Sequence, residues 1–159
     1  MAILIVLFIA DFASSKQSAR RWFNPLACVL LLVQTLVCLI PQAEVSVFGG
    51  MYVTTNAVDV MKAILAGGTL IVFIQSRQWL SRPDMHSMEG EFYMLIVSTL
   101  LGMYMMMSAG HFLMFFLGLE MASIPLACTV AFDKYRNDSA EAAAKFILTA
   151  VFSSGVMLY

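Results

Sequence analysis

The sequence predicts an all-α, multi-pass integral membrane protein, a helical bundle with about six transmembrane helices. Its composition is the first reason, since 61% of the 159 residues are hydrophobic and only 12% are charged, with a mean hydropathy of +0.86. A soluble domain carries about 25% charged residues. The second reason is that long apolar runs recur between short polar breaks, and a bilayer core about 30 Å thick needs roughly 20 apolar residues in a helix.

The polar breaks separate six apolar runs, which we take as the expected spans. They are residues 1–12, 25–40, 57–74, 92–108, 112–132 and 140–159. The first run is short for a span, and the last reaches Tyr159 without a basic anchor. We therefore expect the sequence to be a fragment of a longer chain.

The loops between the spans predict the orientation. Every Lys and Arg outside the spans lies in residues 13–24, 75–91 or 133–139. Such residues are retained on the cytoplasmic side, so we expect these loops to be cytoplasmic, the N-terminus to be outside, and the membrane to be the inner membrane of a bacterium. The loops at residues 41–56 and 108–111 carry no Lys or Arg, and we expect both on the opposite face.

No motif for a bound cofactor, metal or nucleic acid accompanies these spans. The net charge of −1 gives no basic surplus for nucleic acid. Cys28, Cys38 and Cys128 lie in apolar runs without CxxC spacing, and the chain has no nucleotide-binding glycine pattern. We expect no cofactor and no metal in this chain, the lipid bilayer as its surroundings, and any redox chemistry in other subunits.

The informative charged residues inside the predicted spans are Asp59, Lys62, Glu120 and Lys145. An isolated charge at that depth costs several kcal/mol, so each is a functional candidate. Glu120 is near the middle of its span. Burial without a partner favours the neutral carboxyl and a nearby ammonium favours the carboxylate, so Glu120 has the chemistry of a proton switch.

Lys145 is the predicted partner of Glu120 in a proton relay. It follows Glu141 by four residues, on the same helical face, and Ser139 is the expected N-cap of that helix. Pro125 should kink the fifth helix and free a carbonyl near Glu120. The alternative is that Glu120 and Lys145 form a buried ion pair that fixes helix packing without moving protons.

Asp59 and Lys62 are supporting candidates, as are Pro125 and Glu141. Asp59 and Lys62 are spaced i, i+3 near the outer end of the third span, which predicts a local salt bridge with Lys62 snorkelling outward. We favour this packing interpretation over a functional one. His111 is expected to be a solvated residue of the turn before the fifth span.

Two motifs connect the charged residues to a known family. The segments LGLEMASIP at residues 117–125 and EAAAKFIL at residues 141–148 resemble the antiporter-like subunits of NADH-quinone oxidoreductase, or respiratory complex I, and most closely the subunit N family. The resemblance is weakest before Asn56. It implies inverted repeats of helices and a chain of ionisable groups that carries protons across the membrane. On the matching motifs it assigns Glu120 and Lys145 to that chain.

The resemblance implies a non-redox subunit that couples electron transfer from NADH to quinone to proton translocation. NAD, FMN, iron–sulfur clusters and quinone would belong to partner subunits, and the partners would be other complex I membrane subunits. Residues 1–56 would hold the N-terminal helices and an outer loop, and residues 57–159 the helices that begin the proton-translocation module. A subunit of a cation/proton antiporter or membrane-bound hydrogenase, and a purely structural membrane module, are the open alternatives.

Overall fold

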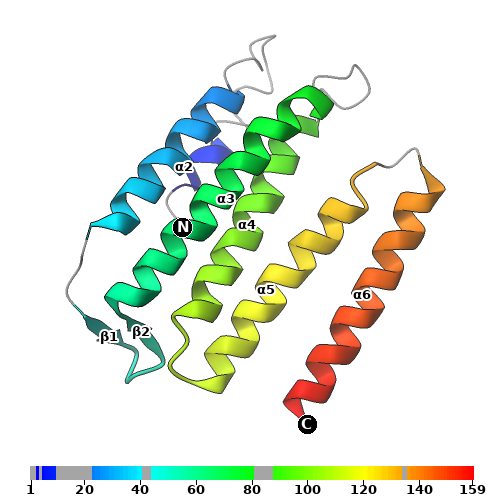
Figure 1. The fold of residues 1–159 in the computed structure, drawn as a ribbon. Helices are drawn as coiled ribbons and strands as arrows, with labels where there is room; N and C mark the ends of the chain where they lie inside the picture. The colour runs from blue at the N-terminus through cyan, green and yellow to red at the C-terminus, as the bar shows by residue number, and fades with distance from the viewer. Residues whose placement is uncertain (1–2, 4, 10–22, 41–43, 81–87, 134–135) are drawn as a thin grey trace. The chain divides into compact units, whose positions relative to one another are not determined.

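The computed structural model describes residues 3, 5–9, 23–40, 44–80, 88–133 and 136–159 (Figure 1). Its elements are α2 (Phe23–Leu39), β1 (Val45–Val47), β2 (Tyr52–Thr54), α3 (Asn56–Leu80), α4 (Glu89–Met107), α5 (Phe112–Val130) and α6 (Asn137–Leu158). They form two compact units. Unit 1 comprises Met1–Ala43 and Thr55–Val97, and unit 2 comprises Glu44–Thr54 and Ser98–Tyr159.

The helical, multi-pass class that the sequence predicts is confirmed. Within the described residues, α3, α4, α5 and α6 are long and apolar enough to cross a membrane, with 25, 19, 19 and 22 residues. Helix α2 is apolar and has 17 residues, which at about 1.5 Å per residue gives about 25 Å, slightly less than a bilayer core. Residues 3 and 5–9 are helical, and the remainder of the first predicted span lies outside the described residues.

Helix α3 continues beyond its predicted end at residue 74 and reaches Leu80. The Ser76 hydroxyl donates to the Phe73 carbonyl at 3.0 Å, and Arg77 lies in the last turn, where a positive charge interacts favourably with the helix dipole. The segment 75–91 was expected to be a loop, but residues 75–80 belong to α3 and residues 89–91 belong to the first turn of α4.

Ser139 is not the N-cap of α6, so that prediction is wrong. The helix begins at Asn137, and the capping position is held by Arg136, whose side chain makes no capping hydrogen bond. The Ser139 hydroxyl instead donates to the Val130 carbonyl at 2.7 Å. This bond satisfies a carbonyl at the end of α5, where helices lack internal donors, and ties the two helices together at their connection.

In unit 1, α2 lies alongside α3 (Figure 1). Ala27 and Leu31 of α2 and Ala66 and Phe73 of α3 are fully buried. Two of these four residues are alanines, whose short side chains allow neighbouring helices to approach closely. Packing of apolar side chains, not exclusion of water, has to hold such helices together in lipid.

Tyr93 joins the first part of α4 to this core and is fully buried. Its ring lies edge-on to Phe73, with centroids 4.6 Å apart. The Asn24 side-chain N–H donates to the Tyr93 hydroxyl, and the Cys28 thiol donates to Oδ1 of the same Asn24 side chain at 3.5 Å. One tyrosine therefore connects α2, α3 and α4 through aromatic packing and a satisfied polar group.

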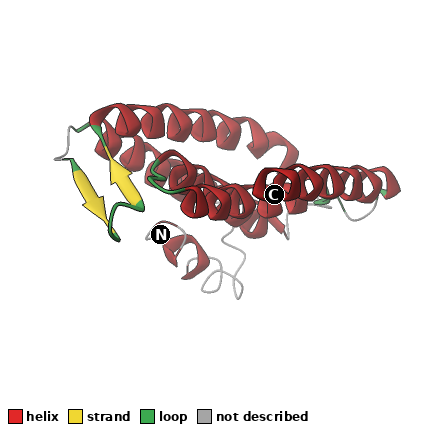
Figure 2. Ribbon diagram, turned by 90° about the horizontal axis from the view of Figure 1, so that it is seen from below, coloured by secondary structure: helices red, strands yellow, loops and turns green. Residues whose placement is uncertain are grey.

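Unit 2 contains a hairpin that the sequence analysis did not predict. Strands β1 and β2 pair antiparallel, with Val45 opposite Thr54 (Figure 2). The Val53 N–H donates to the Ser108 carbonyl at 2.9 Å, and the Gly110 N–H donates to the Met51 carbonyl at 2.8 Å. The hairpin is thus bonded to the turn between α4 and α5, and the two lie at the same end of unit 2.

Glycine is required where the hairpin meets this turn. A Cβ at Gly110 would lie 2.1 Å from the Gly50 carbonyl oxygen, far inside van der Waals contact. Gly49 and Gly50 have positive φ angles of 65° and 92°, and Phe48 precedes them at 55°. The tight turn therefore depends on residues that adopt the left-handed region.

Candidate functional site

Glu120 lies near the middle of α5, as the sequence predicts. Helix α5 spans Phe112–Val130, so Glu120 is about 12 Å from its start and about 15 Å from its end along the axis. Its side chain is half-buried within the chain. Among the described residues Glu120 makes no hydrogen bond or ion pair.

The backbone on both sides of Glu120 touches α4. A Cβ added at Gly118 would lie 2.6 Å from the Met106 amide nitrogen, and one added at Gly102 would lie 2.4 Å from the Ala122 amide nitrogen. Glycines at these two positions allow the helix backbones to approach each other directly, as small residues do between membrane helices. This contact fixes the depth and direction of the Glu120 turn relative to α4, and no residue pattern in the sequence predicts it.

Helix α5 continues through Pro125, which lies inside it. Proline has no N–H, so the Met121 carbonyl lacks its usual donor four residues later. This carbonyl belongs to the residue after Glu120, in accord with the predicted freed acceptor; the kink itself stays a prediction. The Ser123 hydroxyl donates to the Leu119 carbonyl at 2.8 Å, and the Thr129 hydroxyl donates to the Pro125 carbonyl at 2.9 Å.

Lys145 pairs with Glu141 and not with Glu120. Its Nζ atom lies 2.6 Å from Glu141 Oε1, and the two side chains are 73% and 66% exposed. A glutamate four residues before a lysine is the favourable order for such a pair, and it needs only one helix. The structure therefore does not bring the two predicted relay residues into contact, although α5 and α6 are neighbours.

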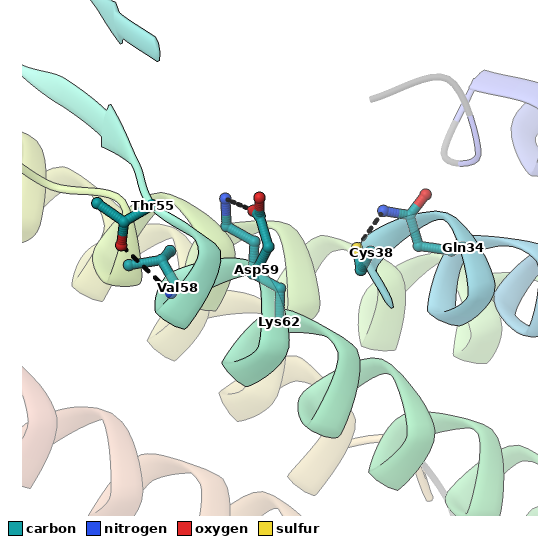
Figure 3. A network of polar contacts seen from close by, with 6 residues as sticks. All are labelled: Gln34, Cys38, Thr55, Val58, Asp59 and Lys62. Carbon is teal, nitrogen blue, oxygen red and sulfur yellow. Dashed lines mark hydrogen bonds and ion pairs between the residues drawn. The ribbon is translucent and has the colours of Figure 1, made fainter. Parts of the chain in front are cut away.

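Asp59 and Lys62 form the predicted i, i+3 salt bridge, with 3.4 Å between Lys62 Nζ and Asp59 Oδ1 (Figure 3). The predicted outward snorkelling of Lys62 is not observed, because the two side chains are only 7% and 12% exposed. Lys62 lies on the buried face of α3 with Ala63 and Ala66. A helical side chain leans toward the N-terminus of its helix, which directs Lys62 to Asp59.

His111 caps α5 and is not simply a solvated turn residue. Its Nδ1 atom accepts from the Leu113 N–H at 3.2 Å, and its extended backbone is typical of a capping position. Histidine is uncommon as a cap, so this role does not follow from the residue type.

The comparisons with known proteins agree with the resemblance on which the sequence analysis relied. Residues 109–159 match the family described as NADH:quinone oxidoreductase/Mrp antiporter, TM. Over 99% of its length, the chain is 56% identical to NADH-quinone oxidoreductase subunit N of Phocaeicola vulgatus. The chain is similar to part of NADH-quinone oxidoreductase subunit N. Over its whole length it is 43% identical to subunit N of Azobacteroides pseudotrichonymphae and 32% identical to that of Neisseria gonorrhoeae.

The chain spans about a third of the length of these curated subunit N relatives, 33% in each case. The family segment 109–159 contains Glu120, Pro125, Glu141 and Lys145, so the candidate residues of α5 and α6 lie where the similarity to an antiporter-type membrane domain is recognised. Asp59 and Lys62 lie outside this segment. The similarity to subunit N covers the candidate residues of α5 and α6 and also Asp59 and Lys62.

Proposed function

We propose that this chain acts as part of a subunit N, a membrane subunit of NADH-quinone oxidoreductase that couples electron transfer from NADH to quinone to proton translocation. The observation that carries this proposal is the 56% identity to a subunit N over 99% of the chain. A subunit of a cation/proton antiporter or membrane-bound hydrogenase is the main rival, because the matching family description includes Mrp antiporters. The three relatives described above are named as subunit N, which favours complex I.

Glu120 and Lys145 are proposed to form one end of the proton relay. Glu120 is half-buried near the middle of α5, and the adjacent close contact with α4 holds it at a defined depth. Lys145 forms an ion pair with Glu141, and both side chains are exposed. Charges inside a membrane face protein or water, not lipid, so this surface of α6 should be covered by protein. Movement of Lys145 from Glu141 to Glu120 would bring a positive charge to the Glu120 carboxyl.

The same proposal implies the partner subunits, the location of the cofactors and the membrane. Other complex I membrane subunits and the lipid bilayer are the expected partners. NAD, FMN, iron–sulfur clusters and quinone are expected in those partners and not in this chain, which would therefore be a non-redox subunit. The Lys and Arg distribution supports the inner membrane of a bacterium, with the N-terminus outside and the basic loops in the cytoplasm.

The direct test is Glu120→Gln, measured in the assembled complex in sealed vesicles. We expect the amount of complex on native gels to be unchanged, because Gln is nearly isosteric with Glu. Proton translocation per NADH oxidised should fall several-fold, because Gln cannot exchange a proton. Glu44→Gln makes the same chemical change at an exposed residue before β1 and should change neither quantity.

Three other outcomes distinguish the rivals. Unchanged proton translocation in Glu120→Gln, and in Glu120→Gln combined with Lys145→Met, would contradict the relay and favour a structural module. Loss of the complex on native gels would assign Glu120 a packing role. Proton translocation driven by a Na⁺ gradient in the absence of NADH and quinone would support an antiporter.

A further inference from the structure

The hairpin of unit 2 presents apolar side chains at its tip, residues 47–51. Val47, Phe48 and Met51 are 41%, 76% and 44% exposed, and the Met51 N–H closes the turn by donating to the Phe48 carbonyl at 3.3 Å. Turns between strands are usually built from Gly, Pro, Asn, Asp and Ser. Here Gly49 and Gly50 supply the conformational freedom, and large apolar residues flank them on both sides. The hairpin tip therefore exposes side chains that a turn in water normally lacks.

The backbone of Phe48 adopts an unfavourable conformation. Its φ angle is 55°, in the left-handed region that residues other than Gly, Asn and Asp rarely visit. A residue held there costs on the order of 1–3 kcal/mol. Gly or Asn at this position would form the same turn more easily, so the turn itself gives no reason for a phenylalanine. An apolar environment outside the chain does give one.

Hydrogen bonds place the hairpin tip at the end of two membrane-spanning helices. Helix α4 ends at Met107 and α5 begins at Phe112. In the turn between them, the Gly110 N–H donates to the Met51 carbonyl at 2.8 Å, and a Cβ at Gly110 would collide with the Gly50 carbonyl oxygen. The tip of the hairpin therefore lies directly beside this turn (Figure 1).

Helix α5 sets the depth of the hairpin tip in a membrane. Its 19 residues extend about 28 Å, close to the roughly 30 Å of a bilayer core. A span of that length has its ends near the two boundaries of the hydrocarbon layer, so the hairpin tip bonded at its start lies near one boundary. Phe112 and Leu113 in the first turn of α5 are 46% and 55% exposed. Exposed apolar side chains of the hairpin and of the helix thus occur at nearly the same depth.

The composition around the hairpin tip favours the apolar part of a bilayer as its partner. No Lys or Arg lies in residues 41–56 or 108–111, and Glu44 is the charged residue of the first segment. Binding to anionic headgroups requires clusters of Lys and Arg. A standard protein interface involves roughly 20–30 residues on each side, whereas the exposed apolar side chains of the tip belong to Val47, Phe48 and Met51.

We propose that the hairpin tip is a membrane anchor, in which Val47, Phe48 and Met51 insert into lipid beside the start of α5. The partner is the bilayer at the level of the ester groups and first acyl carbons, and headgroup charge contributes little. Insertion is favourable because it removes apolar surface from water. Through the bond between Met51 and Gly110, the anchored tip holds the α4–α5 turn at a fixed depth. This inference rests on the membrane-spanning helices and not on proton translocation.

Fluorescence of a single tryptophan tests the insertion. Phe48→Trp is made together with Trp22→Phe and Trp79→Phe, which remove both native tryptophans, and the full chain is reconstituted in phosphatidylcholine vesicles. We expect strong quenching by phosphatidylcholine brominated near the ester end of its acyl chains, and weaker quenching by lipid brominated near the middle. Acrylamide in the water should quench several-fold less than it quenches a free tryptophan. Adding phosphatidylglycerol should leave the lipid quenching unchanged.

The control is Asp138→Trp with the same two replacements of native tryptophans. The Asp138 side chain is 83% exposed in the polar first turn of α6, so acrylamide should quench this variant strongly and brominated lipid only weakly. Equal acrylamide quenching of Phe48→Trp and Asp138→Trp, without quenching by brominated lipid, would place the hairpin tip in water and overturn the proposal. If Phe48→Trp does not reconstitute, Met51→Trp decides by the same criterion.

Photo-crosslinking in the assembled complex separates lipid from a protein partner. Phe48 is replaced by the photoreactive analogue p-benzoylphenylalanine, and the complex is irradiated in its membrane. A lipid adduct on the tip peptide, identified by its mass, is the expected product. A covalent product with another protein chain on a denaturing gel would overturn the proposal and make the hairpin tip a subunit contact. Both measurements are made without NADH, so failure of the proposed proton translocation would leave their outcomes unaffected.

Discussion

Gly118→Ala is expected to lower the free energy of unfolding by about 1–3 kcal/mol, the usual cost of forcing extra methyl groups into a close-packed contact. The added Cβ would lie 2.6 Å from the Met106 amide nitrogen and 3.0 Å from the Gly102 carbonyl oxygen. Both neighbours are backbone atoms, so no side-chain rotation can relieve the overlap and the two helices must separate. Thermal unfolding of the full chain in detergent micelles measures the loss.

The controls for this prediction are glycines at which an added Cβ would meet open space. No heavy atom would lie within 4 Å of a Cβ at Gly68 or Gly155, so alanine there should be neutral or stabilise the helix by up to about 1 kcal/mol. Separation of α4 from α5 should also displace Glu120, so Gly118→Ala should reduce proton translocation in whatever complex still assembles. Equal thermal midpoints for Gly118→Ala and Gly155→Ala would show that the contact does not hold the helices.

The helices could be predicted from sequence because a bilayer imposes their length and composition. Their ends could not, because a helix does not stop where the lipid stops. Residues 75–78 continue α3 with polar side chains, and Asn137 begins α6 before its apolar run. Hydropathy does not predict the hairpin, because its strands are only three residues long. Its residues do carry a local signal, since Gly49 and Gly50 separate Val45–Val47 from Tyr52–Thr54, a pattern typical of a turn between strands.

The candidate site was predictable only in part. Charges inside apolar spans are costly and therefore conspicuous, so Asp59, Lys62, Glu120 and Lys145 could all be singled out. The i, i+3 bridge of Asp59 with Lys62 needs one helix and follows from spacing. Whether Lys145 reaches Glu120 depends on how two helices pack, which spacing does not encode. The structure instead joins Lys145 to Glu141.

The contact of Gly102 with α5 was equally hidden from sequence. Gly102 and Gly118 lie in apolar runs, and no periodicity distinguishes them from Gly155, which has no neighbour within 4 Å of an added Cβ. Only the backbone geometry separates a glycine that permits close approach from one that faces open space.

Tyr93→Ala is expected to destabilise unit 1 by about 3–5 kcal/mol, the range for removing a large aromatic ring from a packed interior. Tyr93 is fully buried, and its ring packs on Phe73 and Phe92 at centroid distances of 4.6 and 5.9 Å. Because membrane helices associate through packing and polar contacts, the loss of one residue that supplies both should be large. Circular dichroism melting of the full chain in detergent measures it.

Tyr93→Phe separates the two contributions of this side chain. It keeps the ring and removes only the hydroxyl that accepts from the half-buried Asn24, so it should cost about 0.5–1.5 kcal/mol, the net contribution of a typical hydrogen bond. Phe152→Ala, at a residue of α6 that is 75% exposed, is the control for loss of an aromatic ring and should change the melting temperature little. If Tyr93→Ala and Phe152→Ala melted at the same temperature, Tyr93 would not be what joins α2, α3 and the first part of α4.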